Sequence, residues 1–184
     1  MNCTGIILAG GASTRMGTPK ALLLYEGETF LARLRRLMGA VCRDVLVVGP
    51  PDAPFRADVV NPHPERGMLS SLQCGLRVVP IIADAIAFTL VDLPSISEAT
   101  LHTIVREWSG ELLRIPRYGG RRGHPVVMSQ ALVEEFLAES GTPKDVIARH
   151  TPETVYVDVE DAGVVADVDT REDYDRLIGR GKEV

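Results

Sequence analysis

Cysteine is scarce in this sequence of 184 residues, and the three present, Cys3, Cys42 and Cys74, never form a C-x-x-C pair. An odd number of isolated cysteines argues against a disulfide framework and against a zinc site. The sequence also lacks an uncharged apolar stretch of the roughly 20 residues that a membrane span needs. No basic segment followed by a long apolar run stands at the N-terminus, as a signal peptide would require. We therefore expect a cytoplasmic protein with no membrane contact.

A surplus of positive charge is absent too. The 20 lysines and arginines are outnumbered by 25 aspartates and glutamates, which gives a formal net charge of −5. A nucleic-acid-binding protein usually carries a basic surplus, so we expect no nucleic-acid partner. The sequence contains no internal repeat, low-complexity tract or linker, and its length fits one domain. We expect a single domain over residues 1–184 that forms a monomer or a weak dimer.

Short apolar runs alternate with amphipathic segments along the whole chain. The runs typical of buried strands are 5–9, 45–48, 85–91, 112–116, 125–128, 155–159 and 164–168. Helical spacing and capping residues predict helices after Thr29, over 69–79, after Ser97, over 130–138 and 143–150, and after Thr170. This alternation is typical of a three-layer α/β/α domain of Rossmann-like type with a mostly parallel, mixed sheet.

A glycine-rich segment at residues 8–20 directly follows the first predicted strand, and ligands of such sheets bind at the carboxyl ends of strands. Gly10 and Gly11 allow the backbone to approach a ligand closely. The hydroxyl of Ser13 and the charges of Arg15 and Lys20 suit phosphate oxygens. The segment matches neither the P-loop nor the dinucleotide fingerprint. It predicts a phosphate-binding loop, with a tight turn that carries two surface cations as the alternative.

Carboxylates follow two of the predicted strands. Asp92 ends the strongly apolar run 85–91, where it would either bind Mg²⁺, which prefers oxygen ligands, or cap the following turn. Asp167 and Asp169 lie two residues apart on an extended segment, so their side chains point to one face. One of them would supply a second metal ligand, or Asp167 or Asp169 would instead stabilise the start of the helix after Thr170.

Positive charge concentrates in and after the predicted strand 112–116 and before the predicted strand 125–128. The residues are Arg114, Arg117, Arg121, Arg122 and His124. Glycines at positions 119, 120 and 123 would let a ligand approach the same stretch closely. Charge runs are usually solvated surface, and a solvated hairpin is therefore the alternative. We expect the stretch to bind an anionic substrate.

Several of these motifs resemble one family. Leu-Ala-Gly-Gly-x-Ser-x-Arg-Met-Gly-x-Pro-Lys at 8–20 is similar to the signature of the nucleotidyltransferase superfamily, and especially of its MobA-like molybdenum-cofactor branch. The other matching motifs, in the order of the family, are Asn61-Pro, Gly67-Met-x-Ser-Ser-Leu-x-x-Gly75, Asp92-x-Pro94, Gly123-His-Pro125 and Asp167-Val-Asp-Thr-x-Glu-Asp-Tyr174. In the motif Asp92-x-Pro94, the family usually has glycine before the aspartate, whereas this chain has Val91. That departure changes local packing and leaves the carboxylate in place.

The resemblance implies a nucleotidyltransferase fold, a Mg²⁺ cofactor and a role for each motif. The loop would bind the triphosphate through Leu8, Ala9, Gly10, Gly11, Ser13, Arg15 and Lys20. The second nucleotide-contacting stretch would contribute Asn61, Gly67, Ser70 and Ser71, although the two serines taken alone are more typical of helix caps. Mg²⁺ would be bound by Asp92 and Asp169. The acceptor would be bound by Arg121, Arg122, Gly123, His124 and Pro125.

The implied reaction transfers CMP or GMP from an NTP to the phosphate of molybdopterin or the molybdenum cofactor and releases pyrophosphate. Arg15, Lys20 and Asp92 would be catalytic, and no protein nucleophile is required. The Gly-Met-x-Ser-Ser and Gly-His-Pro motifs favour CTP, whereas the Ala-Gly-Gly opening is more typical of GTP enzymes. A molybdoenzyme or its chaperone would be the protein partner. The alternatives are transfer to another acceptor (a sugar phosphate, an isoprenoid phosphate or phospholactate) and a non-catalytic module that delivers molybdopterin.

Overall fold

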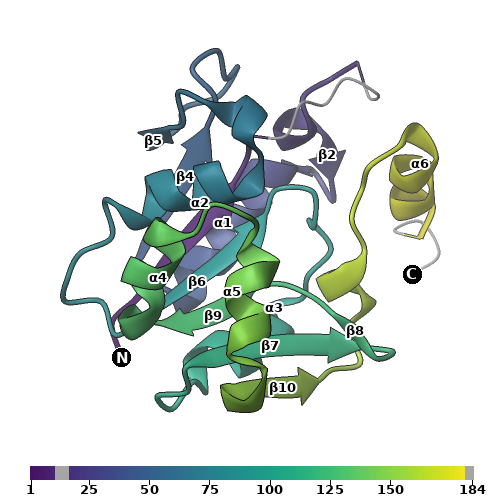
Figure 1. Ribbon diagram of the computed structural model, residues 1–184. Helices are drawn as coiled ribbons and strands as arrows, with labels where there is room; N and C mark the ends of the chain where they lie inside the picture. The colour runs from purple at the N-terminus through teal and green to yellow at the C-terminus, as the bar shows by residue number, and fades with distance from the viewer. Residues whose placement is uncertain (11–16, 181–184) are drawn as a thin grey trace.

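The computed structural model describes residues 1–10 and 17–180 of the chain. In this part of the chain the main sheet has eight strands, in the order β10-β7-β9-β6-β1-β4-β5 with β8 paired to β7 (Figure 1). The strands are β1 (Cys3–Leu8), β4 (Asp44–Gly49), β5 (Val59–Val60), β6 (Ala85–Leu90), β7 (Leu113–Tyr118), β8 (Arg121–Arg122), β9 (Val126–Ser129) and β10 (Thr154–Asp158), and a separate hairpin pairs β2 (Leu24–Tyr25) with β3 (Glu28–Thr29). Strand β9 lies antiparallel between β6 and β7, whereas β5, β4, β1 and β6 run parallel to one another and β7 runs parallel to β10. The predicted mostly parallel, mixed sheet is confirmed.

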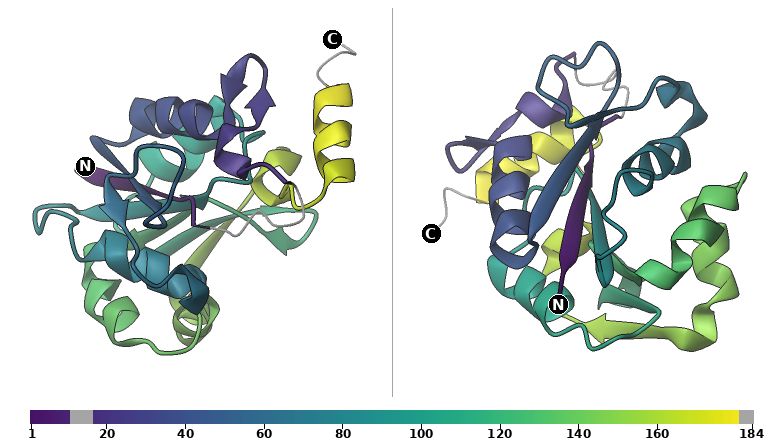
Figure 2. Two further views of the ribbon diagram at one scale, coloured as in Figure 1. Left: turned by 90° about the horizontal axis from the view of Figure 1, so that it is seen from above. Right: turned by 90° about the vertical axis from the view of Figure 1, so that its left-hand side faces the viewer.

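Helices cover both faces of the sheet (Figure 2). One face carries α1 (Phe30–Val41) and α3 (Glu98–Leu101), which continues as a π-helical segment (His102–Arg106); the other carries α2 (Met68–Leu76), α4 (Val133–Ala138) and α5 (Pro143–Arg149). Short 3-10 turns lie at Lys20–Leu22, Pro64–Arg66, Gln130–Leu132, Thr151–Glu153 and Ala162–Val165. The closing helix α6 (Arg171–Arg180) stands beside these layers, near β2. Across residues 1–10 and 17–180, no helix combines the length and the apolar character needed to cross a membrane.

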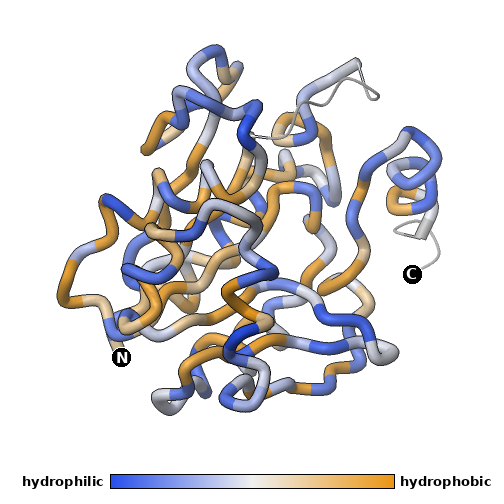
Figure 3. Tube along the Cα trace, in the orientation of Figure 1, coloured by the Kyte–Doolittle hydropathy of each residue, from blue (hydrophilic) through white to orange (hydrophobic). Residues whose placement is uncertain are grey.

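The central strands are buried on both faces, so alternate side chains enter two different cores. Ile7 of β1 belongs to the cluster that contains Phe30 and Leu34 of α1, whereas Ile6 and Leu8 belong to the cluster on the α2 side. Burying each such side chain contributes about 1.5–3 kcal/mol. This double burial is why the strand sequences are continuous apolar runs. Helix α6, in contrast, is mostly hydrophilic (Figure 3).

The helix starts predicted from capping residues are confirmed. The hydroxyls of Thr29, Ser97 and Thr170 each accept a hydrogen bond from the amide three residues later, at 3.2, 3.2 and 3.1 Å. Such a bond satisfies one of the amides that a helix start leaves without a partner. Helix ends are less well predicted, because α2 stops at Leu76 rather than at residue 79 and the helix after Ser97 changes to π geometry after one turn.

The predicted strand over 164–168 is wrong, because Ala162–Val165 forms a 3-10 turn. The carbonyl of Val164 accepts a hydrogen bond from the amide of His124 at 2.9 Å, so this segment packs on a loop and joins no ladder. Val164 and Val168 are nevertheless buried. Apolar periodicity over a few residues reports burial and does not distinguish a strand from a packed turn.

Gly123 packs directly against this turn, since a Cβ there would lie 2.3 Å from the carbonyl oxygen of Val164. The substitution Gly123→Ala therefore forces the backbone to move, and we expect it to lower the free energy of unfolding by about 1–3 kcal/mol. The matched control is Gly39→Ala, at a helical position with open space around it, which we expect to raise that free energy by about 0.5–1 kcal/mol. Urea denaturation followed by circular dichroism measures both, and an unchanged midpoint for Gly123→Ala would contradict the close packing.

Candidate active site

A cavity of about 300 Å³ lies at the carboxyl ends of β1 and β6. These ends meet because Leu8 pairs with Leu90 in the parallel ladder. The cavity is lined by residues 8–10 after β1, residues 90–92 after β6, Lys20, and Gly67, Met68 and Ser71 at the start of α2. The segments expected to bind the nucleotide therefore do meet in space. Gly11, Ser13 and Arg15, which belong to the same prediction, lie outside the described residues.

Lys20 joins two carboxylates at the edge of this cavity. Its Nζ lies 3.0 Å from Oδ2 of Asp92 and 2.5 Å from Oδ1 of Asp169. The amide of Val168 donates to the carbonyl of Asp92 at 2.9 Å, which brings the following aspartate alongside. Asp92 thus uses its carboxylate on Lys20 and does not cap the turn that follows it. Both of the later aspartates are exposed, and Asp169 is the one that contacts Lys20.

Burial and the contacts within this group shift the pKa values of Asp92 and Lys20. Burial raises the pKa of Asp92 above its ordinary value, and the nearby ammonium of Lys20 only partly opposes that rise. Burial lowers the pKa of Lys20, but its contacts with Asp169 and Asp92 outweigh burial and raise it overall. Within the described residues Oδ1 of Asp92 is buried and accepts no hydrogen bond. A buried, unpaired carboxylate oxygen suits a hard divalent cation.

The two carboxylates alone would not complete the shell of such a cation. No group of three or more histidine, cysteine, aspartate or glutamate side chains converges anywhere in residues 1–10 and 17–180. Mg²⁺ is commonly bound by one or two carboxylates, waters and the phosphates of a substrate. The residues present fit a cation of that kind, which would be bound together with a nucleotide.

The side chain of Asn61 is hydrogen-bonded to residues at the start of α2, where Ser71 lines the cavity. Asn61 is 1% exposed. Its Nδ2 donates to the hydroxyl of Ser71 at 3.0 Å, and its Oδ1 accepts from the hydroxyl of Ser70 at 3.1 Å and from the amide of His63 at 2.9 Å. Ser71 lines the cavity and Asn61 does not. Neither serine caps α2, whose N-cap is Gly67 with φ of 84°, so the helix-cap alternative for the serines is not what the structure shows.

A larger cavity, of about 910 Å³, adjoins the first one. Gly67 and Met68 line both cavities and so form a shared wall. The apolar lining includes Phe88, Ile115 and Val126. Of the residues expected to bind the acceptor, Arg121, Arg122, Gly123 and His124 line this cavity, whereas Pro125 is buried and does not.

The basic stretch divides into two parts. Arg114 pairs with Glu111 at 2.7 Å and Arg117 pairs with Asp158 at 2.7 Å, so these two cations are neutralised within the protein. Arg121 and Arg122 have no carboxylate partner among the described residues and line the cavity instead. The sequence prediction did not include Arg66 and Lys144, which line it as well.

His124 lines the larger cavity without carrying charge at neutral pH. Its ring packs edge-on against Phe88 with centroids 6.1 Å apart. Burial, with a smaller effect of the nearby Lys144, lowers the pKa of His124 to about 4. No described residue forms a hydrogen bond with the ring, which leaves its nitrogens available to a ligand. A neutral imidazole in this position can orient a ligand but contributes no ionic attraction.

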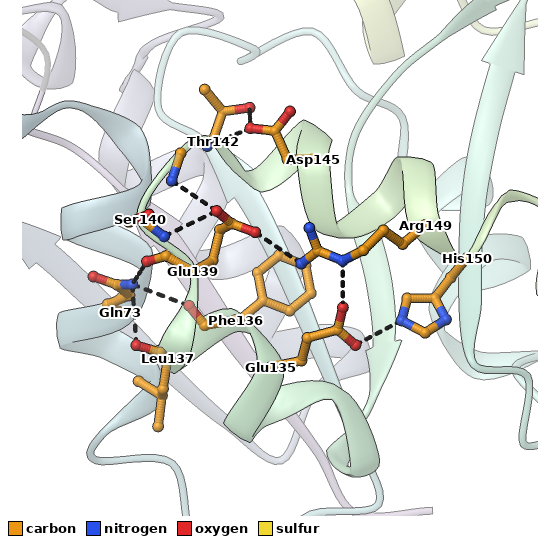
Figure 4. A network of polar contacts seen from close by, with 11 residues as sticks. Gln73, Glu135, Phe136, Leu137, Glu139, Ser140, Thr142, Asp145, Arg149 and His150 are labelled. Carbon is orange, nitrogen blue, oxygen red and sulfur yellow. Dashed lines mark hydrogen bonds and ion pairs between the residues drawn. The ribbon is translucent and has the colours of Figure 1, made fainter.

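A polar network holds the wall that α5 contributes to this cavity (Figure 4). Arg149 binds Glu135 and Glu139, each at 2.7 Å, and His150 binds Glu135 at 2.6 Å. The side-chain Nε2 of Gln73, on α2, donates hydrogen bonds to the backbone carbonyl oxygens of residues 136, 137 and 139, at 3.0, 3.3 and 2.8 Å. Helices α2, α4 and α5 are therefore fastened together next to the cavity.

The sequence is similar to those of molybdenum cofactor guanylyltransferases. A probable molybdenum cofactor guanylyltransferase of Bacillus cereus is 29% identical over 128 residues, which are 64% of this chain and 63% of that protein. A molybdenum cofactor guanylyltransferase of Xanthomonas euvesicatoria is 38% identical over 101 residues, 53% of this chain and 51% of that protein. The chain thus matches about half to two thirds of the length of these curated relatives.

Structural similarity extends further along the chain. The crystal structure of Rv0371c from Mycobacterium tuberculosis superimposes with a TM-score of 0.81 at 28% identity, covering 97% of this chain and 98% of that one. A manganese complex of Rv0371c gives a TM-score of 0.78 at 26% identity, covering 97% and 99%. Residues 5–155 match the family described as MobA-like NTP transferase domain, which is most of the chain. The chain therefore belongs to the MobA-like NTP transferase family.

Proposed function

We propose that this protein transfers a nucleoside monophosphate from an NTP to the phosphate of a molybdopterin-type acceptor and releases pyrophosphate. The observation that carries the proposal is the meeting of Lys20, Asp92 and Asp169 at a small cavity that shares a wall with a larger, cationic one. Two adjoining cavities suit two substrates that must react with each other. The names of the curated relatives support the same acceptor.

The smaller cavity is the proposed NTP site. Lys20, together with the loop residues Gly10, Gly11, Ser13 and Arg15, would contact the triphosphate. Positive charge and backbone amides aimed at the β- and γ-phosphates would stabilise the charge that grows on departing pyrophosphate. The acceptor phosphate is already ionised at neutral pH, so no protein base has to remove a proton from it.

Asp92 and Asp169 are the proposed ligands of Mg²⁺. When bound, the ion would neutralise phosphate charge and orient the reacting groups. Support comes from the unpaired Oδ1 of Asp92 and from the manganese complex of the similar protein Rv0371c. Lys20 would then exchange its carboxylate contacts for phosphate contacts.

The larger cavity is the proposed acceptor site. Its apolar lining suits a flat heterocycle, and its arginines suit an attached phosphate. The Gly-Met-x-Ser-Ser and Gly-His-Pro motifs favour CTP as donor, whereas the Ala-Gly-Gly opening and the names of the curated relatives favour GTP. The donor base is therefore the first property to measure.

Calorimetric titration with CTP, GTP, ATP and UTP in turn, each with Mg²⁺, should give binding of CTP or GTP at least tenfold tighter than of the other nucleotides. With the preferred donor, the protein should release pyrophosphate only when molybdopterin is added. Absence of pyrophosphate with every donor would overturn the enzyme proposal and leave the delivery module. Release with a sugar phosphate or isoprenoid phosphate, but not with molybdopterin, would overturn the acceptor.

Asp92→Asn removes the charge of the proposed metal ligand and keeps its shape. We expect kcat to fall at least about 100-fold, because the charge on the phosphates loses its compensation. Asp44→Asn is the matched control, since Asp44 is exposed at the opposite, amino end of β4. Pyrophosphate release measures the effect, with the circular dichroism spectrum confirming the fold. Full activity of Asp92→Asn would refute the metal assignment.

The low pKa of His124 predicts how stability depends on pH. The unfolded chain takes up a proton on this residue near the ordinary pKa of 6.5, whereas the folded protein does so only near 4. The unfolding free energy should therefore fall as the pH drops from about 6.5 to about 4, by up to about 3 kcal/mol. His124→Gln should flatten this dependence in urea denaturation, whereas His102→Gln, at an exposed position, should not. Equal pH profiles for His124→Gln and the unmodified protein would contradict the neutral imidazole.

A further inference from the structure

Of the lysine and arginine side chains that the structure describes, most are paired with carboxylates. Among the lysine and arginine side chains described up to Arg176, those without a carboxylate within ion-pair distance are Arg56, Arg66, Arg77, Arg106, Arg121, Arg122 and Lys144. Four of these, Arg66, Arg121, Arg122 and Lys144, line the larger cavity. In a chain with net charge −5, such a concentration of unneutralised cations favours an anionic ligand.

Arg66 differs from the other three cations in its place along the chain. Its neighbours Gly67 and Met68 form the wall between the two cavities, and Pro64 lines the smaller one. Arg121 and Arg122 come from β8, and Lys144 comes from α5, neither of which reaches the smaller cavity. Arg66 is thus the cation of the larger cavity that is next to the shared wall. A phosphate that reacts with the α-phosphorus of a nucleotide has to lie at this boundary.

The backbone around Arg66 is well fixed. Its amide donates to the carbonyl of His63 at 3.1 Å within the 3-10 turn. The same carbonyl accepts from the hydroxyl of Ser70 at 3.2 Å, and that hydroxyl lies 3.1 Å from Oδ1 of Asn61. The buried amide of Asn61 therefore ties the turn to α2. The next residue, Gly67, has φ of 84°, a conformation that strongly favours glycine and turns the chain sharply into the helix.

We propose that Arg66 binds the reacting phosphate of the acceptor, and that this contact selects phosphomonoesters over the corresponding alcohols. The inference rests on the proposed nucleotidyl transfer and adds a residue to the acceptor site. A planar guanidinium binds two phosphate oxygens side by side, which fixes the direction of the third. It also reduces the repulsion between two anionic substrates that must approach each other.

In the proposed transfer step, one phosphorus–oxygen bond forms and one breaks. An acceptor phosphate oxygen forms a bond to the α-phosphorus of the NTP, and the bond from that phosphorus to the oxygen bridging to the β-phosphate breaks. The electron pair of the broken bond leaves on pyrophosphate, and no proton needs to move. Arg66 takes part by orienting and partly neutralising the attacking phosphate.

The test compares Arg66→Gln with Arg77→Gln, because Arg77 is an exposed arginine without an ion-pair partner that lines neither cavity. The probes are 6-hydroxymethylpterin and its phosphate monoester, with binding followed by pterin fluorescence. The unmodified protein and Arg77→Gln should bind the phosphate ester at least tenfold more tightly than the alcohol. Arg66→Gln should lose that preference, keep its affinity for the alcohol and keep its calorimetric affinity for NTP with Mg²⁺. In turnover it should raise the KM of the acceptor and leave the KM of the NTP unchanged.

Each outcome decides one of the two proposals. Equal preference for the phosphate ester in Arg66→Gln and the unmodified protein would overturn the role of Arg66. If the unmodified protein binds no pterin phosphate, the same comparison is made with a sugar phosphate, an isoprenoid phosphate and phospholactate. Binding that depends on Arg66 would then support this inference and overturn the pterin acceptor, and absence of all binding would overturn Arg66. Failure to bind any NTP would overturn the proposed transfer itself.

Discussion

The burial of one carboxylate at the end of the central sheet constrains much of this structure. Asp92 follows β6, and burial disfavours its charge. An unpaired buried charge would cost several kcal/mol, so the fold has to bring a cation to it. Lys20 does so from the segment after β1, and the amide of Val168 binds the carbonyl of the same residue. Three segments that are distant in sequence are thereby joined at one point, and the small cavity lies beside it.

The turn Pro64–Arg66 and the first residues of α2 separate the two cavities. Gly67 and Met68 line both cavities, Pro64 lines the smaller one and Arg66 lines the larger one. Asn61 fixes this turn, because it accepts from the amide of His63 and is hydrogen-bonded to Ser70 and Ser71 of α2. Gly67 allows the turn to enter α2 at a backbone angle that other residues rarely adopt. Transfer between two anionic substrates depends on where their phosphates meet. A rigid wall between their sites is a direct way to set that position.

Much of this arrangement is predictable from the sequence, with informative exceptions. The sheet and the helix starts follow from apolar runs and capping residues. The meeting of the segments after β1 and β6 follows from the shared carboxyl edge of parallel strands. The segment 164–168 was wrongly predicted, because a buried turn and a strand have the same apolar pattern over five residues. Arg66 and Lys144 could not be recognised as neighbours of the proposed acceptor site, since only the tertiary structure places the turn before α2 and the start of α5 around one cavity.

The sequence by itself determined the α/β architecture, the family and the residue types at the carboxyl edge of the sheet. These depend on local periodicity and on motifs, which are properties of short stretches of chain. Only the tertiary structure decided that Asp169 rather than Asp167 contacts Lys20, that Asn61 lies beneath the cavity and that His124 is neutral. Distances between remote segments and the degree of burial set these properties. Both arise only when the layers pack, and neither is written in local sequence.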